Sequence, residues 1–291
     1  MQVIEIDSEP YPTPAQSDGT SVVIDLRDPV TIDPFPTSEQ VDAPPNYGEA
    51  GPPQVSLAVL MPVFNEARTV RQAVQDVLSV HYPCPMELIV VNDGSTDETA
   101  SILASLSDDR LTVLHHAVNR GKGAALKTAA SATTGATHVV PFDADLEYSA
   151  ADLLRLVDQV VDGRANVVFG SRRSGRSVPH QNRLYAIGNT VMTKVANTLY
   201  GSRLTDLHTC LKLVPARLFA QLPLLEEGFG LDTELTAWLL RSGAQLREVP
   251  ISYRSRSRAE GKKISWRDSL VCFHLLFRIR LEDAPVLGGA A

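Results

Sequence analysis

The chain has 291 residues, 44% hydrophobic and 21% charged, an ordinary composition for a globular protein of one large domain or two small ones. Its formal charge of −7 is unevenly placed. Residues 1–54 hold ten acidic residues and one arginine, whereas the rest of the chain holds 26 basic and 24 acidic residues. Because this body is nearly neutral, the chain is neither an acidic enzyme nor a generally basic nucleic-acid binder.

The first 54 residues contain ten of the 19 prolines and are predicted to form a disordered, acidic leader. A segment of this composition buries too little apolar surface to offset its ordering entropy. The apolar run at 21–26 leaves an alternative, a strand added to another element. We therefore expect the folded body to begin at residue 55.

Three cysteines and the lack of a long apolar run bear on the compartment. Cys84, Cys210 and Cys272 form no zinc or disulfide pattern, which favours a reducing cytoplasm. Cys210 is expected to be a buried small residue rather than a nucleophile. No stretch of about 18 apolar residues predicts a spanning helix. We expect a cytoplasmic protein, with a peripheral position at the inner face of the membrane as the alternative.

From residue 56 onward, apolar runs of strand length alternate with helical patterns. Strands are predicted at 56–61, 86–91, 111–115, 137–142, 165–169, 211–214 and 245–253. A capping box at Ser95 and Glu98 predicts the start of one helix, and Ser149 is expected to cap another at 149–161. Further helices are predicted at 66–80, 123–133, 184–200, 215–221, 232–241 and 264–281. This order predicts an α/β fold, a mostly parallel sheet with helices on both faces. Ligands of such sheets bind beyond the carboxyl ends of the strands.

Asp143 and Asp145 follow the fourth predicted strand. In an extended segment, residues i and i+2 point to the same side, so both carboxylates can meet at one point. Such a pair suits Mg²⁺ or Mn²⁺ held together with the phosphate oxygens of a substrate. The alternative is a solvated acidic turn. Because Pro141 has no amide donor, the strand is expected to end or bulge beside it.

The turn at 119–123, Asn-Arg-Gly-Lys-Gly, enters a predicted helix. Its free backbone N–H groups and the Lys122 ammonium are candidates to face a phosphate. The turn lacks the Gly-x4-Gly-Lys-Ser/Thr spacing of a P-loop, and no Gly-x-Gly-x-x-Gly follows the first strand. A P-loop nucleotide hydrolase and a dinucleotide dehydrogenase are therefore both disfavoured.

Four motifs, in this order, resemble those of a known family: Pro-Val-Phe-Asn-Glu at 62–66, Asn-Asp-Gly-Ser-Thr-Asp at 92–97, the turn at 119–123 and Asp-Ala-Asp at 143–145. They resemble the GT-A glycosyltransferases of family 2, and within these the dolichyl- or polyprenyl-phosphate sugar synthases. The resemblance covers about 56–267. It implies a GT-A, Rossmann-like fold with a single catalytic domain at 55–263, followed by an amphipathic helix and tail at 264–291.

The resemblance also assigns residues to a nucleotide diphosphate sugar and to a divalent metal, Mg²⁺ or Mn²⁺. It implies that the base and ribose are lined by Pro62, Phe64, Glu66, Asn92 and Asp93. It implies that the metal is held by Asp143 and Asp145, with Glu147 as a third ligand or merely a helix-entry acid. Asn92 stands where the family usually has an acid.

Two basic stretches resemble phosphate-binding elements of that family. The loop with Arg172 and, further on, Arg183 resembles the Gly-Ser-Arg loop that meets the acceptor phosphate. Arginine forks suit phosphate oxygens. The stretch with Arg258 and Lys263 is similar to the element that closes over the diphosphate. A solvated basic loop is the alternative for each.

The leading hypothesis is inverting transfer of a hexose from GDP-mannose or UDP-glucose to a polyprenyl or dolichyl phosphate. A phosphate acceptor is already anionic, so metal, arginines and in-line placement suffice. A sugar or small-molecule hydroxyl acceptor would need a general base, for which Asp232 and Glu234 are candidates. A sugar-phosphate nucleotidyltransferase or a non-catalytic scaffold ranks lower, and no nucleic-acid partner is expected.

The helix predicted at 264–281 is basic and amphipathic. Such a helix can lie on an anionic membrane beside a lipid acceptor. Packing against the protein body is the alternative, because its aromatic residues would fit a core equally well.

Overall fold

The computed structural model describes residues 2–5, 55–173, 183–255 and 266–285. The predicted site residues Arg258 and Lys263 lie outside these ranges, and Arg183 is described only as the first residue of a helix. Within the described ranges, no helix combines the length and the apolar character needed to cross a membrane.

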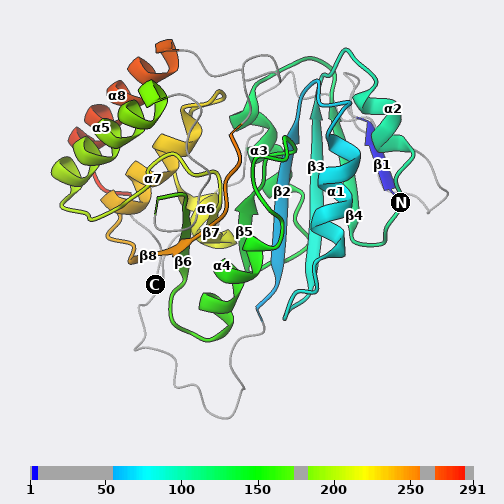
Figure 1. Ribbon diagram of the computed structural model, residues 1–291, viewed down its shortest axis with the longest axis horizontal. Helices are drawn as coiled ribbons and strands as arrows, with labels where there is room; N and C mark the ends of the chain where they lie inside the picture. Colours follow the sequence, from blue (N-terminus) through cyan, green and yellow to red (C-terminus); the bar gives the residue numbers. More distant parts are fainter. Residues whose placement is uncertain (1, 6–54, 174–182, 256–265, 286–291) are drawn as a thin grey trace, which may run out of the picture.

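One sheet runs through the described part of the molecule, with strand order β1-β4-β3-β2-β5-β7-β6-β8 (Figure 1). Neighbouring strands are parallel except at β7, which runs antiparallel to β5 and β6. The strands are β1 Gln2–Glu5, β2 Leu57–Val63, β3 Met86–Asp93, β4 Leu111–His116, β5 His138–Pro141, β6 Val167–Ser171, β7 Lys212–Pro215 and β8 Leu246–Pro250. The predicted mostly parallel sheet is confirmed.

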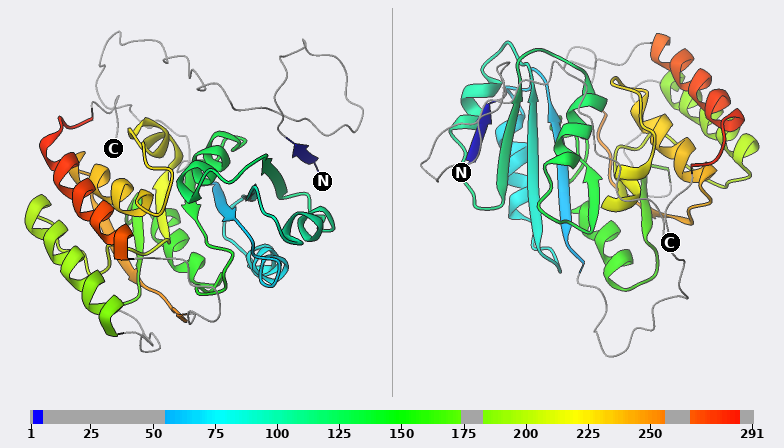
Figure 2. Two further views of the ribbon diagram at one scale, coloured as in Figure 1. Left: turned by 90° about the horizontal axis from the view of Figure 1, so that it is seen from above. Right: turned by 180° about the vertical axis from the view of Figure 1, so that it is seen from behind.

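Helices cover both faces of this sheet, as predicted (Figure 2). They are α1 Val70–Ser79, α2 Thr99–Ala104, α3 Lys122–Ser131, α4 Asp152–Val161, α5 Arg183–Tyr200, α6 Ala216–Gln221, α7 Leu231–Arg241 and α8 Trp266–Leu281. Side chains alternate along β2: Leu57, Val59 and Met61 join the core beneath α1, α2 and α4, whereas Ala58 and Leu60 join the core beneath α3 and α5 to α8. Two cores therefore share one sheet.

Several predicted boundaries shift for identifiable reasons. β5 ends at Pro141, as the missing amide donor requires. The capping box predicted at Ser95 is wrong, because the Ser95 Oγ accepts the N–H of Asn65 at 2.9 Å and α2 begins only at Thr99. The Asp97 carboxylate accepts the Thr99 N–H instead, at 3.0 Å. Ser149 likewise caps α4 through its backbone carbonyl and not its side chain.

Strand β1 belongs to the leader for which composition predicts disorder. It pairs in parallel with β4, with Gln2 opposite Thr112 and Glu5 opposite His115. The exposed edge of β4 offers backbone hydrogen-bond partners, which composition does not reveal. The expectation of disorder therefore fails for these four residues, and the apolar run at 21–26 lies outside the described ranges.

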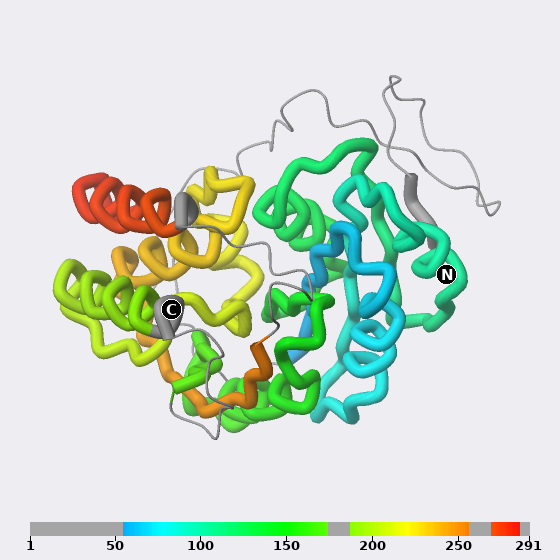
Figure 3. The backbone as a smooth tube through the Cα atoms, turned by 45° about the horizontal axis from the view of Figure 1, so that its top comes forward, coloured from blue at the N-terminus to red at the C-terminus, as the bar shows by residue number. Residues whose placement is uncertain are grey.

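The sheet reverses its strand order beside β2. β3 and β4 follow β2 on one side, whereas β5 lies on its other side. In open α/β sheets, the crevice beyond such a switch point is where ligands bind. We call the region beyond the carboxyl ends of β2 and β5 the crevice. Figure 3 shows the chain from β2 to α3 on one side of the molecule and α5 to α8 on the other. The switch point places the segments after β2 and β5 next to each other.

The segment before α7 lies against the start of α3. The Gly123 N–H donates to the Glu227 carbonyl at 2.7 Å, and the Ala124 N–H reaches the same oxygen at 3.3 Å. Gly121 has φ +97°, and a Cβ there would lie 2.3 Å from that oxygen. A Cβ on Gly123 would lie 2.3 Å from the Glu226 carbonyl oxygen. Only glycines permit this approach, which joins the two halves of the crevice.

We expect the substitution Gly123→Ala to destabilise the protein by about 2 kcal/mol, because the new methyl meets a backbone oxygen that has little freedom to move. Gly188→Ala is the matched control, since Gly188 also lies in a helix but a Cβ there meets nothing within 4 Å. That control should be stabilising by about 0.5–1 kcal/mol. Urea unfolding of the two variants measures both effects. Equal stabilisation by both would contradict the close packing.

Candidate active site

The loops after β2 and β3 are tied to each other and form one wall of the crevice. The Asn65 side chain accepts the Thr96 N–H at 2.8 Å, while the Asn65 N–H donates to the Ser95 Oγ. Asn65 has φ +53°, a conformation that asparagine tolerates better than most residues. Of the predicted base and ribose residues, this wall holds the partly buried Pro62, Phe64 and Glu66. These three residues lie at the end of β2 and in the loop that follows it.

Asn92 and Asp93 end β3 and are both buried. The Asn92 amide contacts the His115 Nδ1 at 3.0 Å and accepts the Ser95 N–H at 3.2 Å. Asp93 binds the His116 Nδ1 at 2.7 Å and accepts two backbone N–H groups, from Arg120 at 2.9 Å and Gly121 at 2.8 Å. Asp93 therefore holds the turn at 119–123 in place. This supporting role was not foreseen, because its histidine partner lies on the neighbouring strand.

In the turn at 119–123, predicted to bind phosphate, backbone N–H groups bond to other parts of the protein. The first N–H groups of α3 are not turned to the crevice as free donors, because Gly123 and Ala124 donate to the Glu227 carbonyl. Lys122, by contrast, extends its ammonium toward the acids after β5, as described below. The sequence predicts two kinds of phosphate donor here, the backbone N–H groups and the Lys122 ammonium. Of these, the Lys122 ammonium reaches the crevice, whereas the N–H groups of Gly123 and Ala124 do not.

The acids after β5 lie on a turn, not on the extended segment that the sequence suggested. The Asp145 carboxylate accepts the Glu147 N–H at 3.0 Å, and Leu146 between them has φ +59°, a strained value for a bulky residue. Glu147 accepts the hydroxyl of Tyr253 at 2.5 Å. The turn thus directs Glu147 to Tyr253, a partner that sequence reasoning missed.

The three predicted metal ligands, Asp143, Asp145 and Glu147, do not form one cluster. Among the described residues, no group of three or more His, Cys, Asp and Glu side chains is placed to hold a metal ion. Glu147 as a third ligand is therefore not supported. Asp143 and Asp145 remain a suitable pair for Mg²⁺ or Mn²⁺, provided that substrate oxygens complete the coordination. A cation already lies against Asp143, since the Lys122 Nζ is 2.8 Å from its Oδ1.

Four charged side chains from different elements alternate in sign across the crevice. The Lys122 ammonium contacts both Asp143 and Asp232, the latter at 3.2 Å. The Asp232 carboxylate lies 3.6 Å from the ammonium of Lys212, which also donates to the Asp232 carbonyl at 2.8 Å. We call this series, Asp143, Lys122, Asp232 and Lys212, the charge chain. It links the end of β5 and the starts of α3, β7 and α7.

The charge chain changes the acidity of its members. Burial raises the pKa of Asp232, but Lys122 and Lys212 outweigh burial and lower that pKa below its usual value. The Lys212 side chain is fully buried, and burial lowers its pKa despite the nearby Asp232. Lys212 also lies over the Phe169 ring at 5.5 Å. Asp232 is therefore an ionised, doubly paired carboxylate and a weak base.

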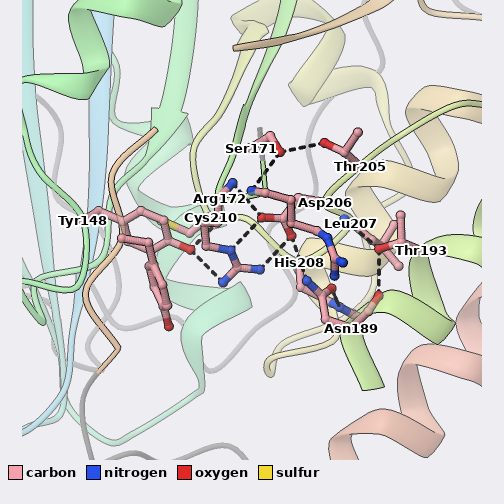
Figure 4. Close-up of polar contacts among 12 residues, drawn as sticks. Tyr148, Ser171, Arg172, Asn189, Thr193, Thr205, Asp206, Leu207, His208 and Cys210 are labelled. Atoms are coloured by element: carbon pink, nitrogen blue, oxygen red, sulfur yellow. Dashed lines mark hydrogen bonds and ion pairs between the residues drawn. The ribbon is translucent and has the colours of Figure 1, made fainter. Parts of the chain in front are cut away.

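Arg172, predicted to meet the acceptor phosphate, makes a buried fork with Asp206 (Figure 4). Its Nε lies 2.6 Å from Asp206 Oδ2 and its Nη2 lies 2.7 Å from Oδ1. The Arg172 Nη1 donates to the Tyr148 hydroxyl at 3.3 Å, and the guanidinium lies 4.9 Å from the centre of the Tyr253 ring. Burial raises the pKa of Asp206, but Arg172 outweighs it and holds that pKa well below its usual range. The fork with Asp206 uses two of the five N–H donors of the guanidinium.

A hydrogen-bonded series leads from Asp206 to the start of α7. The Asn189 amide donates to Asp206 at 3.0 Å, and its oxygen lies 2.8 Å from the His208 Nδ1. The His208 Nε2 lies 3.1 Å from the Thr233 Oγ1. Burial, with Lys212 as the next contributor, lowers the pKa of His208 to about 4, so this imidazole is neutral at pH 7. The series connects the Arg172 loop with the residue that follows Asp232.

Two further predicted residues are structural. Glu234 is fully buried, accepts the Glu226 N–H at 2.8 Å and pairs with Arg278 of α8 at 2.9 Å. It is therefore not available as a general base. Cys210 is buried, as predicted, and burial raises the pKa of its thiol, so it is not a nucleophile.

We expect Asp206→Asn to destabilise the protein by about 3–5 kcal/mol, because it leaves the buried Arg172 without its counter-charge. The matched control is Asp162→Asn, since Asp162 pairs with Arg164 at the surface, where both side chains are largely exposed. Loss of that pair should change stability by less than about 1 kcal/mol. Urea midpoints of both variants at pH 7 provide the measurement. A similar small change in both would show that the fork contributes little.

The sequence and structure of the chain match known proteins along most of the described body. The profile of glycosyl transferase family 2 matches residues 58–222. Glycosyltransferase AglJ of Haloferax volcanii is 25% identical over 232 residues, 79% of this chain and 74% of AglJ. The dodecaprenyl-phosphate galacturonate synthase of Rhizobium johnstonii is 25% identical over 263 residues, 84% of this chain and 74% of that protein. Two other Haloferax relatives are longer, and the chain spans 34% and 48% of them.

Among solved structures, the fold resembles that of glucosyl-3-phosphoglycerate synthase from Mycobacterium tuberculosis. A complex of that enzyme with Mn²⁺, UDP and phosphoglyceric acid superimposes with a TM-score of 0.61 and 20% identity, covering 79% of each chain. The similarity supports the predicted GT-A fold, which the sheet order and the helices on both faces already indicate.

Proposed function

The chain belongs to glycosyl transferase family 2, and we propose that it transfers a hexose, with inversion, from a nucleotide diphosphate sugar to a polyprenyl phosphate. The proposal follows relatives such as the dodecaprenyl-phosphate galacturonate synthase, whose name gives a polyprenyl phosphate as the acceptor. GDP-mannose and UDP-glucose are the proposed donors.

The observation that carries this proposal is the pairing of Asp232. A hydroxyl acceptor needs a general base, for which Asp232 and Glu234 are the candidates. Its carboxylate contacts two ammonium groups, from Lys122 and Lys212, and its pKa is lowered. Glu234, the second candidate, is buried against Arg278. A phosphate acceptor is anionic without help, so it matches a crevice whose candidate bases are committed to ion pairs.

In the proposed reaction, an oxygen of the acceptor phosphate attacks the anomeric carbon of the donor. The bond from that carbon to the diphosphate breaks, and the nucleoside diphosphate leaves with the bonding electrons. No proton needs to move, because the attacking oxygen is already ionised at neutral pH. What remains for the protein is to hold both substrates in line and to stabilise the charge that develops on the leaving diphosphate.

The donor would lie across the switch point. Its base and ribose would face the wall with Phe64 and Asn92, and its diphosphate would face the end of β5. Asp143 and Asp145 would hold Mg²⁺ or Mn²⁺, which when bound neutralises the leaving diphosphate. The Lys122 ammonium lies 2.8 Å from Asp143 and would stabilise the negative charge of the same diphosphate.

A panel of nucleotide sugars with polyprenyl phosphate tests the proposal. We expect transfer of hexose from GDP-mannose or UDP-glucose in Mn²⁺ or Mg²⁺, and its loss in EDTA. Asp145→Ala should reduce transfer by about 10²-fold or more, because it removes one of two carboxylates from the metal. Asp109→Ala, at an exposed acid outside the crevice, is the control and should be unaffected. Transfer only to hydroxyl acceptors would overturn the choice of acceptor, and full activity of Asp145→Ala would overturn the site.

We also propose that α5 and α8 form a peripheral membrane contact beside the lipid acceptor. These helices lie side by side on the outside of the molecule, joined by the Tyr200 hydroxyl on the Leu276 carbonyl at 2.7 Å (Figures 1 and 2). α8 packs its buried stripe, Cys272, Leu275, Leu276 and Ile279, against the body, so the predicted packing is present. Other apolar side chains of the pair stay exposed: Ile187, Val191, Leu270, Val271 and Phe277.

The double variant Leu270→Ser, Phe277→Ser tests the membrane contact. Both residues are at least half exposed and one seven-residue repeat apart on α8, so they share a face and can change without disturbing the core. We expect the double variant to bind anionic liposomes about tenfold more weakly in a sedimentation assay. Each of the two apolar side chains contributes at most about 1–2 kcal/mol to the free energy of membrane binding. Leu225→Ser, at an exposed apolar residue outside α5 and α8, is the control. Equal sedimentation of all three proteins would refute the contact.

A further inference from the structure

Lys122 occupies an unusual position for a residue expected to bind phosphate. Its ammonium lies 2.8 Å from Asp143 Oδ1, 3.1 Å from Asp143 Oδ2 and 3.2 Å from Asp232 Oδ2. The side chain is only 12% exposed. The carboxylate proposed to bind the metal is therefore already neutralised by a cation of the protein itself.

A divalent ion on Asp143 and the ammonium in this position exclude each other. Both would use the same carboxylate oxygens, and two cations a few ångströms apart repel strongly where little water screens them. Lys122 must leave Asp143 before a metal ion can bind there. The four-carbon stem of lysine allows such a movement without a change in the backbone.

The Asp232 carboxylate contacts Lys122 at 3.2 Å but does not depend on it as its sole counter-charge. The carboxylate keeps a second cation 3.6 Å away, the ammonium of Lys212, whose side chain is fully buried and fixed by the Asp232 carbonyl. If Lys122 departs, Asp232 remains paired. The charge chain is thus built with one permanent cation, Lys212, and one that can be exchanged, Lys122.

We propose that Lys122 is an exchangeable counter-cation that couples metal binding to donor binding. Without nucleotide, it neutralises Asp143 and opposes a metal ion. When the diphosphate enters the crevice, its negative charge attracts Lys122 away from Asp143 and opens that carboxylate to the metal. Because such coupling is reciprocal, the metal likewise favours the diphosphate by leaving Lys122 free for it. This inference rests on the proposed metal site at Asp143 and Asp145.

The substitution Lys122→Gln separates this role from a structural one. We expect the variant to bind Mn²⁺ alone about tenfold more tightly, because the competing cation is gone. We expect it to bind UDP and GDP in EDTA about tenfold more weakly, because the phosphate has lost a cation. Free Mn²⁺ is measured by electron paramagnetic resonance, and nucleotide binding by isothermal titration calorimetry. Damage to the fold would weaken both and would not produce opposite changes.

Lys127→Gln is the matched control, one turn further along α3. Its ammonium lies 3.4 Å from the carbonyl oxygens of Leu224 and Leu225, away from the charge chain. Both affinities should stay within about twofold of the wild type. Lys122→Arg, which keeps the charge, should bind Mn²⁺ alone no more tightly than the wild type.

The outcomes distinguish this inference from the proposed function. If wild-type protein binds Mn²⁺ with nucleotide but Lys122→Gln binds Mn²⁺ alone no more tightly, the exchange is refuted and the metal site stands. If wild-type protein binds no Mn²⁺ even with UDP or GDP, the metal site is refuted and the exchange with it. Weaker binding of both ligands by Lys122→Gln would reduce Lys122 to a structural residue.

Discussion

The crevice of this protein depends on the requirement that charges with little water around them be paired. Two ion-paired groups meet this requirement at the carboxyl edge of the sheet. One is the fork between Asp206 and Arg172, the residue that follows β6. The other is the charge chain, which joins β5, α3, β7 and α7 through Asp232. The fork and the charge chain each link segments that the backbone hydrogen bonds of the sheet do not connect.

The pairing also decides which chemistry the crevice can support. Asp232 is ionised and keeps its pair with Lys212 even when Lys122 moves away, so it serves better as an electrostatic support than as a base. Neutral His208 lies in the same hydrogen-bonded region, but it is partly buried and bonded at both ring nitrogens. A reaction in which no proton moves suits such surroundings. In the proposed reaction, charge stabilisation and placement would carry the catalysis.

The sequence was sufficient to predict seven of the eight described strands and the helical layers on both faces of the sheet, because strand and helix periodicities are local signals. It did not reveal β1, whose segment has the composition of a disordered leader. It also placed Asp143 and Asp145 correctly after the strand that Pro141 ends. It was not sufficient to predict partners. Lys122 and Asp232 are 110 residues apart in the chain, and the Glu227 group that receives the α3 amides is a backbone carbonyl, which any residue carries. Sequence reasoning also missed that the side chains of Asp93 and Glu147 are bonded to His116 and Tyr253, which lie 23 and 106 residues further along the chain.

The close approach of Gly121 and Gly123 to the backbone at 226–228 has a consequence for exchanging parts between relatives. The turn at 119–123 belongs to the N-terminal half of the described body and the segment before α7 to its C-terminal half, yet the backbone of each fits closely against the other. A chimera that joins the N-terminal half of one relative to the C-terminal half of another would therefore need both segments from the same parent. The boundary between exchangeable parts of this protein must therefore leave that contact intact, so it does not simply follow the division between the two halves.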